Sequence, residues 1–301
     1  FNNHRFKETI VLDGIGLPAD FILKLKALKS KVIYNHAGSP NAAMLFFGRN
    51  GNRASNLKNI KSTYLKMINL YTHILFQSPT QAKKLNELRS EKEDITLVLR
   101  PSVSMSDIGC VKSNILEIDK SNFNLVIVGS VQERKGQHRL PEIAKLLCNN
   151  IPNLKLHIVG PIINLDYKKR IDKLIKKNKL ENCIIFHGFK ANYLDYMNSS
   201  DIILQVSEEE GVSRVLREAM ALQKVIVSFR LDGTNDLLVE GEDSLLSDFG
   251  DVNAISKNIL KIYNDKTLAD TLSKNALINF DKKYSRKIYL SNLKKILNNL
   301  I

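Results

Sequence analysis

The sequence predicts an α/β protein with parallel sheets, divided into two domains. Short continuous apolar runs alternate with helical patterns along much of the chain, which is typical of parallel strands that helices cover on both faces. Polar, glycine-containing turns follow several of these runs, where the carboxyl ends of the strands would lie. The length of 301 residues suits two domains, and the 44% hydrophobic and 25% charged residues are ordinary values for a soluble globular protein.

We expect the first domain to span residues 1–120. Its strands are predicted at 8–13, 31–34, 73–77 and 95–99, and its helices at 19–30, 57–70 and 81–88. Residues 101–122 mix serine, aspartate, glycine and lysine without a clear period, and they are expected to link the two domains.

The second domain is expected at residues 121–283, where the pattern is sharper. Its strands are predicted at 125–129, 154–159, 184–186, 202–206 and 225–228, with helices between them. After Val252 the chain is predicted to be mostly helical.

Composition narrows the classes of protein to consider. No apolar run approaches the roughly 20 residues that cross a bilayer. Cys110, Cys148 and Cys183 are odd in number and lack the spacing of metal or redox sites, so they suit a reducing cytoplasm. Phe1 is not a start methionine, which is compatible with a fragment of a longer chain.

The net charge of +14 is concentrated in residues 1–80, which hold eleven Lys and Arg against three Asp and Glu. Basic surfaces attract nucleic acid, anionic membrane or acidic substrates. The same basic segment contains the apolar residues Met44, Leu45, Phe46 and Phe47. Three interpretations are open: these residues belong to the core, form a lid, or contact a membrane.

Two turns of the first domain follow predicted strands. The sequence from Gly14 to Ala19 matches Gly-x-Gly-x-x-Ala, a fingerprint of dinucleotide sites. The next strand, however, ends in Asn35-His36 and lacks the acid that would hold a ribose, so a plain strand-to-helix turn is favoured. His36 is either a hydrogen-bonded loop residue or part of a site at this edge of the sheet.

The segment Val206–Ala221 carries the most informative spacing. Glu210 is predicted in the turn after a strand, and Glu218 lies two turns into a helix that begins near Ser213. Eight residues of helical rise separate the two acids by about 12 Å, a distance that suits the two ends of an extended ligand. The helix N-terminus between them offers free N–H groups to a phosphate. The alternative is a solvated acidic turn.

A second turn supplies positive charge. Gly129–Gly136 follows the first strand of the second domain and contains Arg134 and Lys135. Glycines permit a close backbone approach, and adjacent cations can hold phosphate oxygens. The alternative is a basic surface turn.

The spacing Glu-x7-Glu, followed by Ala-Met-Ala and an apolar strand, resembles the donor-site motif of retaining glycosyltransferases of family 4. The resemblance covers residues 124–265 well and the preceding part more loosely. It implies the GT-B fold, in which two Rossmann-like domains with parallel sheets face each other across a cleft. Only one strand and one helix precede His36, so the first domain is shortened relative to that family. Two interpretations are open: the chain is truncated, or the acceptor domain is a reduced one. The helix at 284–301 is a candidate for packing back onto the first domain.

The resemblance implies a role for each matching residue. Glu210 would contact sugar hydroxyls, Glu218 the ribose, and Arg134 and Lys135 the diphosphate, with His36 lining the sugar pocket. The turn of Gly188, Phe189 and Lys190 would hold the base through backbone groups. The rest of the nucleotide sugar would further be held by Gly129, Ser130, Gly136, Gly211, Val212 and Ser213. Many relatives have arginine at the position of Ser130, and Arg134 is expected to take over that contact.

We therefore expect a retaining glycosyltransferase that uses a nucleotide sugar and a glycan or lipid-linked acceptor, with peripheral contact to an anionic membrane on its cytoplasmic side. No Asp-x-Asp occurs in the sequence, so no metal or other cofactor is expected. One alternative is a non-catalytic subunit that binds nucleotide sugars. A nucleic-acid binder ranks last, because no aromatic-basic RNA motif or helix-turn-helix pattern accompanies the charge, and no nucleic acid is expected as a partner.

Overall fold

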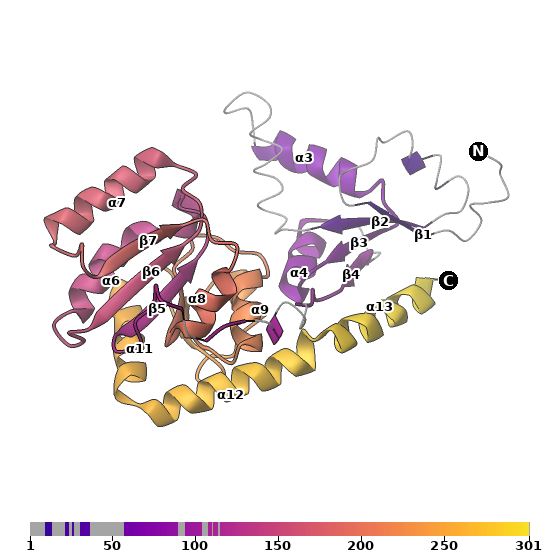
Figure 1. Cartoon of the computed structure of the whole chain (residues 1–301). Coiled ribbons are helices and arrows are strands. Elements are labelled where there is room, and N and C mark those ends of the chain that lie inside the picture. Colours follow the sequence, from indigo (N-terminus) through magenta and orange to yellow (C-terminus); the bar gives the residue numbers. More distant parts are fainter. Residues whose placement is uncertain are drawn as a thin grey trace. The chain divides into compact units, whose positions relative to one another are not determined.

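The chain forms two compact units (Figure 1). One unit comprises Phe1–Pro101 with Tyr289–Ile301, and the other comprises Ser102–Ile288. The structure, a computed structural model, describes residues 10–13, 22–23, 26, 31–36, 57–89, 94–103, 108–109, 111–113 and 115–300. The fingerprint at 14–19 and the apolar segment Met44–Phe47 lie outside these residues.

The first unit contains a four-stranded parallel sheet in the order β1-β2-β3-β4. Its elements are β1 (Ile10–Asp13), β2 (Lys31–His36), α3 (Leu57–Ile68), β3 (His73–Phe76), α4 (Pro79–Leu88), β4 (Thr96–Val98) and α13 (Arg286–Leu300). On one face of the sheet, Ile74 and Phe76 are buried with Tyr64 and Ile68 of α3 and Leu85 of α4. Short apolar strands alternating with helices thus give a parallel sheet, as the sequence predicts.

The last helix, α13, belongs to the same unit from Tyr289 onward. Leu300 is buried with Ile33 and Leu75 of the sheet and with Leu99, and Leu293 and Ile296 pack against this cluster. Residues at the far ends of the sequence therefore share one core.

The second unit contains a six-stranded parallel sheet with helices on both faces (Figure 1). Its strands are β5 (Phe123–Val128), β6 (Leu154–Val159), β7 (Ile184–Gly188), β8 (Ile202–Gln205), β9 (Val225–Phe229) and β10 (Leu245–Ser247). Its helices are η1 (Glu133–Lys135), η2 (Gln137–Arg139), α6 (Leu140–Leu147), α7 (Leu165–Lys177), α8 (Tyr193–Ser199), α9 (Arg214–Ala221), α10 (Asp232–Asn235), α11 (Val252–Asn264) and α12 (Lys266–Lys283).

The strand order β10-β9-β8-β5-β6-β7 creates a switch point between β5 and β8. From β5 the chain moves outward through β6 and β7, and from β8 it moves the other way through β9 and β10. The turns after β5 and β8 therefore leave neighbouring strands in opposite directions at the carboxyl edge, where doubly wound sheets bind their ligands. Both sequence motifs of the second domain lie in these two turns.

The two units divide at Pro101, whereas the sequence places the boundary at residue 120. Val103 and Ile118 are buried in the core of the second unit, together with Val126 and Ile203 of its sheet. The expected linker is thus partly built into the second unit, because scattered apolar residues are buried there without forming a periodic element.

The helix predicted at 19–30 lies mostly outside the described residues. The other predicted strands and helices are present, with ends that differ by a few residues where both ends are described. Among the described strands, β10 was not predicted; it has three residues and pairs with β9. A run this short lacks a pattern of its own and is recognisable only through its partner strand.

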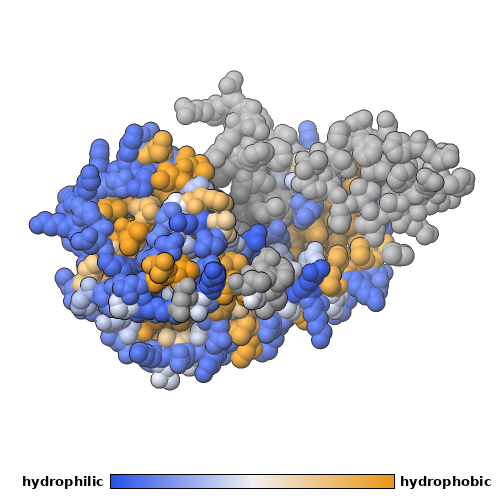
Figure 2. All heavy atoms as spheres, viewed as in Figure 1, coloured by the Kyte–Doolittle hydropathy of each residue, from blue (hydrophilic) through white to orange (hydrophobic). Residues whose placement is uncertain are grey.

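On the face shown in Figure 2, the coloured atoms are mainly hydrophilic, with separate hydrophobic areas between them. Exposed large apolar side chains of the second unit include Ile163, Leu165 and Phe189. Among the helices of the described residues, none is both long and apolar enough to span a membrane.

Candidate functional site

The turn after β5 is shaped by two glycines. Gly136 has φ 68° and lies against the end of β8, since a Cβ there would be 1.9 Å from the carbonyl oxygen of Val206. Gly129 lies beneath the side chain of Lys135. A Cβ added at Gly129 would be 3.3 Å from the Cε of Lys135. The glycines therefore let this turn and its lysine lie directly beside the β8 turn.

Lys135 and Arg134 both meet Glu210 across the switch point. The Nζ of Lys135 lies 2.6 Å from Oε1 of Glu210, and a guanidinium nitrogen of Arg134 lies 3.8 Å from Oε2. Ser207 also donates its hydroxyl to Oε1 of Glu210 at 2.8 Å. The side chains of Lys135 and Glu210 are only 17% and 9% exposed, so this ion pair is screened little by solvent. The structure thus brings together three of the predicted site residues.

A second ion pair joins the same two turns and was not predicted. Arg139 donates to Glu208, and its guanidinium also lies over the rings of Phe229 and Phe249, at 5.8 and 5.2 Å from their centroids. The sequence shows Glu208 only as one of three consecutive acids. Its partner becomes visible only when β5 and β8 are known to be neighbours.

His138 is another titratable residue in the turn after β5. Its Nε2 lies 3.8 Å from Glu208, and Tyr167 of α7 contacts its backbone and ring nitrogens. Partial burial, followed by the charge of Arg139, lowers the pKa of His138 below its usual range. At neutral pH this imidazole therefore adds no charge to the site.

Helix α9 begins where the sequence predicts. Ser213 is its N-cap, since its hydroxyl oxygen accepts a hydrogen bond from the backbone N–H of Leu216, and the same hydroxyl donates to Gln205. Gly233, in α10 after β9, lies against the turn that precedes α9. A Cβ at Gly233 would be 1.5 Å from the carbonyl oxygen of Gly211 in that turn. The backbone of Gly211, Val212 and Ser213 therefore leads directly into the positive end of the helix dipole.

Glu218 is the most buried acid of the site, with a side chain that is 1% exposed. Its Oε1 accepts hydrogen bonds from the Nε of Arg214 and from the hydroxyl of Tyr193, both at 2.7 Å. Its Oε2 is buried and has no hydrogen-bond partner among the described residues. Neither Arg214 nor Tyr193 was predicted, and Tyr193, on α8, could not be linked to Glu218 by spacing. A buried carboxylate oxygen without a donor is costly, so this atom is suited to a ligand hydroxyl.

The predicted base-binding turn follows β7. Gly188 has φ 67°, and its carbonyl oxygen accepts a hydrogen bond from the N–H of Gly160 at 2.8 Å. Phe189 is 74% exposed, and Lys190 lies 3.8 Å from Glu117. This turn offers backbone groups and an exposed ring, as a site for a planar base requires.

The remaining predicted residues are placed as follows. Ser130 lies in the β5 turn, where its hydroxyl oxygen accepts a hydrogen bond from Gln132 at 2.6 Å. His36 ends β2 in the first unit, and its side chain lies outside the described residues. Among the described residues, no group of three or more His, Cys, Asp and Glu could hold a metal ion.

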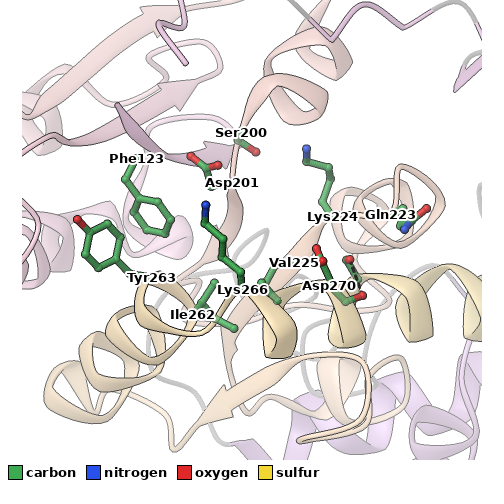
Figure 3. A pocket seen from close by; sticks show the side chains of 12 residues that line it. Phe123, Ser200, Asp201, Gln223, Lys224, Val225, Ile262, Tyr263, Lys266 and Asp270 are labelled. Carbon is green, nitrogen blue, oxygen red and sulfur yellow. Dashed lines mark hydrogen bonds between the residues drawn. The ribbon is translucent and has the colours of Figure 1, made fainter. Parts of the chain in front are cut away.

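A cavity of about 410 Å³ lies at the opposite, amino-terminal edge of the second sheet (Figure 3). Phe123, at the start of β5, and Tyr263 of α11 form one wall, with ring centroids 5.0 Å apart. Asp201 and Lys224 line it from the starts of β8 and β9. None of the predicted site residues lines this cavity.

A doubly wound sheet with cations and a helix N-terminus at its switch point defines a nucleotide-binding class of α/β protein. The chain belongs to the family described as "Glycosyl transferases group 1", whose model matches residues 111–278. This family membership confirms the predicted family, and the match includes both motif-bearing turns.

Similar sequences carry related descriptions. The capsular polysaccharide biosynthesis glycosyltransferase CapM of Staphylococcus aureus is 26% identical over 180 residues, covering 60% of this chain and 47% of CapM. The 2-deoxystreptamine N-acetyl-D-glucosaminyltransferase of Niallia circulans is 23% identical over 223 residues, covering 71% of this chain and 56% of that enzyme. The chain thus spans about half the length of the curated relatives it matches.

Solved structures confirm the predicted GT-B type of α/β fold. Anabaena Alr3699/HepE in complex with UDP superposes with a TM-score of 0.80 at 17% identity, covering 98% of this chain and 79% of that one. A glycosyltransferase from Rickettsia africae gives a TM-score of 0.78 at 18% identity, covering 97% and 76%. At these identities the likeness establishes the fold alone.

Proposed function

We propose that this chain carries the donor site of a retaining glycosyltransferase, which transfers a sugar from a nucleotide sugar to a hydroxyl of a glycan or lipid-linked acceptor. The observation that carries the proposal is the buried Oε2 of Glu218, which has no donor among the described residues, beside the N-terminus of α9. A ribose hydroxyl would supply that donor and leave the attached diphosphate at the helix N-terminus.

The leaving group is stabilised by the protein's own charges in this proposal. As the bond between the anomeric carbon and the diphosphate breaks, negative charge grows on the phosphate oxygens. Lys135 and Arg134, with the N–H groups at the start of α9, are the groups that would meet this charge. Glu210, which already contacts both cations, would then be adjacent to the sugar.

Retention of the anomeric configuration follows from attack on the face that the diphosphate leaves. The acceptor oxygen forms its bond to the anomeric carbon on that face while the bond to the phosphate oxygen breaks. The departing phosphate takes the acceptor proton, so no protein base is required. No metal is required either, because the cations of the β5 turn supply the positive charge.

The deciding experiment is transfer from UDP-, GDP- and ADP-sugars to a panel of glycan and lipid-linked acceptors, with and without EDTA. We expect transfer from one donor class, product with the donor's anomeric configuration by proton NMR, and an unchanged rate in EDTA. Inverted product would contradict the retaining mechanism, and a rate restored only by magnesium or manganese would contradict the metal-independent one.

A non-catalytic nucleotide-sugar binding subunit is the second candidate. Tight binding of a nucleotide sugar without transfer or hydrolysis would establish this function instead.

A further inference from the structure

Two histidines of the second sheet form a hydrogen-bonded pair that the proposed mechanism does not use. Nδ1 of His157, on β6, lies 2.9 Å from Nε2 of His187, on β7, and the two rings stack with centroids 5.1 Å apart. Nε2 of His157 lies 3.0 Å from Oδ1 of Asn124, at the start of β5. The chain of contacts thus crosses three adjacent strands of the sheet.

The hydrogen-bond network assigns the protons of this pair. Asn124 uses its amide Nδ2 to donate to the carbonyl oxygens of Asp119 and Asn122, so its Oδ1 must accept. Nε2 of His157 therefore carries a proton, and in the neutral ring Nδ1 is the acceptor. His187 then donates from its Nε2, and its own Nδ1 remains the site for a further proton.

An irregularity of the sheet accompanies the pair. Ile158 is paired with Phe186 and Val159 with Gly188, so His187 is an extra residue on β7 without a partner of its own on β6. Bulges of this kind redirect a side chain beside functional sites. Here the bulge immediately precedes the turn at Gly188–Lys190.

The same turn is tied to His187 through a second route. The ring of Tyr196 makes an edge contact with His187, at 4.9 Å between centroids, and its hydroxyl donates to Glu117 at 3.2 Å. Lys190 lies 3.8 Å from the same carboxylate and 5.8 Å from the centroid of the Tyr196 ring. Lys190, at the far end of the turn, is therefore held by Tyr196, which contacts His187, while Gly188 at the near end directly follows His187 in the chain.

We propose that the hydrogen-bonded pair of His157 and His187 sets the position of the turn at Gly188–Lys190, which makes His187 a positioning residue for the donor nucleotide. The inference rests on the proposed function, because that function assigns the base to this turn. A second proton on His187 would place a positive charge near Lys190 and disturb the turn. The charged and titratable groups around the pair are Lys155, Lys190, Glu117 and Tyr196.

The test compares two variants by calorimetric titration with UDP at pH 7.5. His187→Leu removes the donor to His157, whereas His187→Gln keeps an amide N–H near the position of Nε2 and cannot take up a proton. We expect roughly tenfold weaker binding for the leucine variant, which corresponds to about 1.4 kcal/mol, and binding within about twofold of the parent for the glutamine variant. Lowering the pH to 5.5 should weaken UDP binding more in the parent than in His187→Gln.

Asn279→Leu is the matched control, because it also replaces a buried, hydrogen-bonded polar side chain of this unit by leucine. Asn279 is also buried in this unit and donates to Asp243, but it lies on α12. We expect it to lower thermal stability and leave UDP affinity unchanged. If UDP does not bind, GDP and ADP are titrated in the same way.

The outcomes separate this inference from the proposed function. A parent that binds none of the three nucleotides overturns both. A parent that binds while His187→Leu binds equally well overturns the positioning role alone, as does a glutamine variant as weak as the leucine variant. Nitrogen NMR of the unmodified protein gives an independent check, because a His157 ring protonated on Nδ1 rather than Nε2 at neutral pH would also overturn it.

Discussion

Glu218 and Glu210 lie in one turn-and-helix segment, yet their surroundings give them different roles. Glu218 has one bonded oxygen and one buried oxygen without a donor, whereas Glu210 has cations or a hydroxyl on both. The first is therefore prepared to accept a hydrogen bond from a ligand. The second must share its cations with any diphosphate that binds.

We predict that Glu218→Ala weakens binding of both the nucleoside diphosphate and the nucleotide sugar. A hydrogen bond to a charged group contributes roughly 1.5–3 kcal/mol, so the loss should be about ten- to a hundredfold. Calorimetric titration measures both ligands. Glu142→Gln, at an exposed position of α6, is the control variant and should bind like the parent. Unchanged binding by Glu218→Ala would contradict the assignment of the ribose to this residue.

We predict that Glu210→Gln slows transfer about ten- to a hundredfold without weakening the free nucleoside diphosphate. The substitution removes the charge that occupies Lys135 and Arg134, so these cations stay available to phosphate. Initial rates and calorimetric titrations on the same preparation separate the two effects. Loss of diphosphate affinity instead would show that Glu210 positions the β5 turn.

We predict that the stability of the protein depends on pH through His157, the buried histidine of β6. Burial, followed by the nearby His187 and Lys155, lowers the pKa of His157 to about 4. The unfolded chain binds a proton near pH 6.5 but the folded chain does not, so stability is fully present above about pH 6.5 and falls as the pH is lowered towards 4.

By pH 5 the loss attributable to His157 should be on the order of 2 kcal/mol in the free energy of unfolding. Urea unfolding at pH 7 and pH 5 measures it. His157→Gln should reduce this difference, whereas His138→Gln, whose parent side chain is 43% exposed, should change it less. Equal pH dependence in the parent and His157→Gln would argue against the assignment.

At the scale of elements, two βα turns meet because β5 and β8 are neighbours. Gly136 of the β5 turn lies against the backbone at the end of β8, and Gly233, in α10 after β9, lies against the β8 turn. The ion pairs of Lys135 and Arg139 then join the turns through side chains. The site is therefore a property of strand order as much as of residue type.

We predict that Gly136→Ala both destabilises the second unit and weakens nucleotide binding. A Cβ would lie 1.9 Å from the carbonyl oxygen of Val206, so one of the two turns must shift. Gly241→Ala is the matched control, since Gly241 has a similar φ of 73° and no atom within 4 Å of an added Cβ. It should cost only backbone strain, about 1–2 kcal/mol.

Thermal unfolding and UDP titration of both variants make the comparison. Weaker binding in Gly241→Ala as well would mean that the strain of a left-handed alanine, and not the contact with β8, is responsible.

At the scale of the whole molecule, the charge of +14 is uneven, with eleven Lys and Arg against three Asp and Glu in residues 1–80. We predict that the protein sediments with anionic liposomes at low salt and that about 0.5 M salt releases it, because each basic residue near such a surface contributes about 1 kcal/mol. Neutral liposomes are the control. Equal binding to neutral and anionic vesicles would contradict an electrostatic contact.

The sequence by itself determined the class of fold and located the two turns that carry the candidate site. Apolar runs such as 125–129 and 202–206 are buried on both sides, so composition alone marks them as parallel strands. The Glu-x7-Glu spacing and the Arg-Lys turn are local, so they are legible without any tertiary contact. The same holds for Ser213, whose capping role depends on residues of its own helix.

Only the tertiary structure decided which of these residues meet. The pairing of Lys135 with Glu210 joins residues 75 positions apart, and that of Arg139 with Glu208 joins residues 69 apart. The donors to Glu218, the buried histidine pair and the inclusion of Val103 and Ile118 in the second core likewise depend on strand order. The physical reason is that a sequence pattern reports whether a residue is buried, whereas the packing of neighbouring strands determines what lies against it.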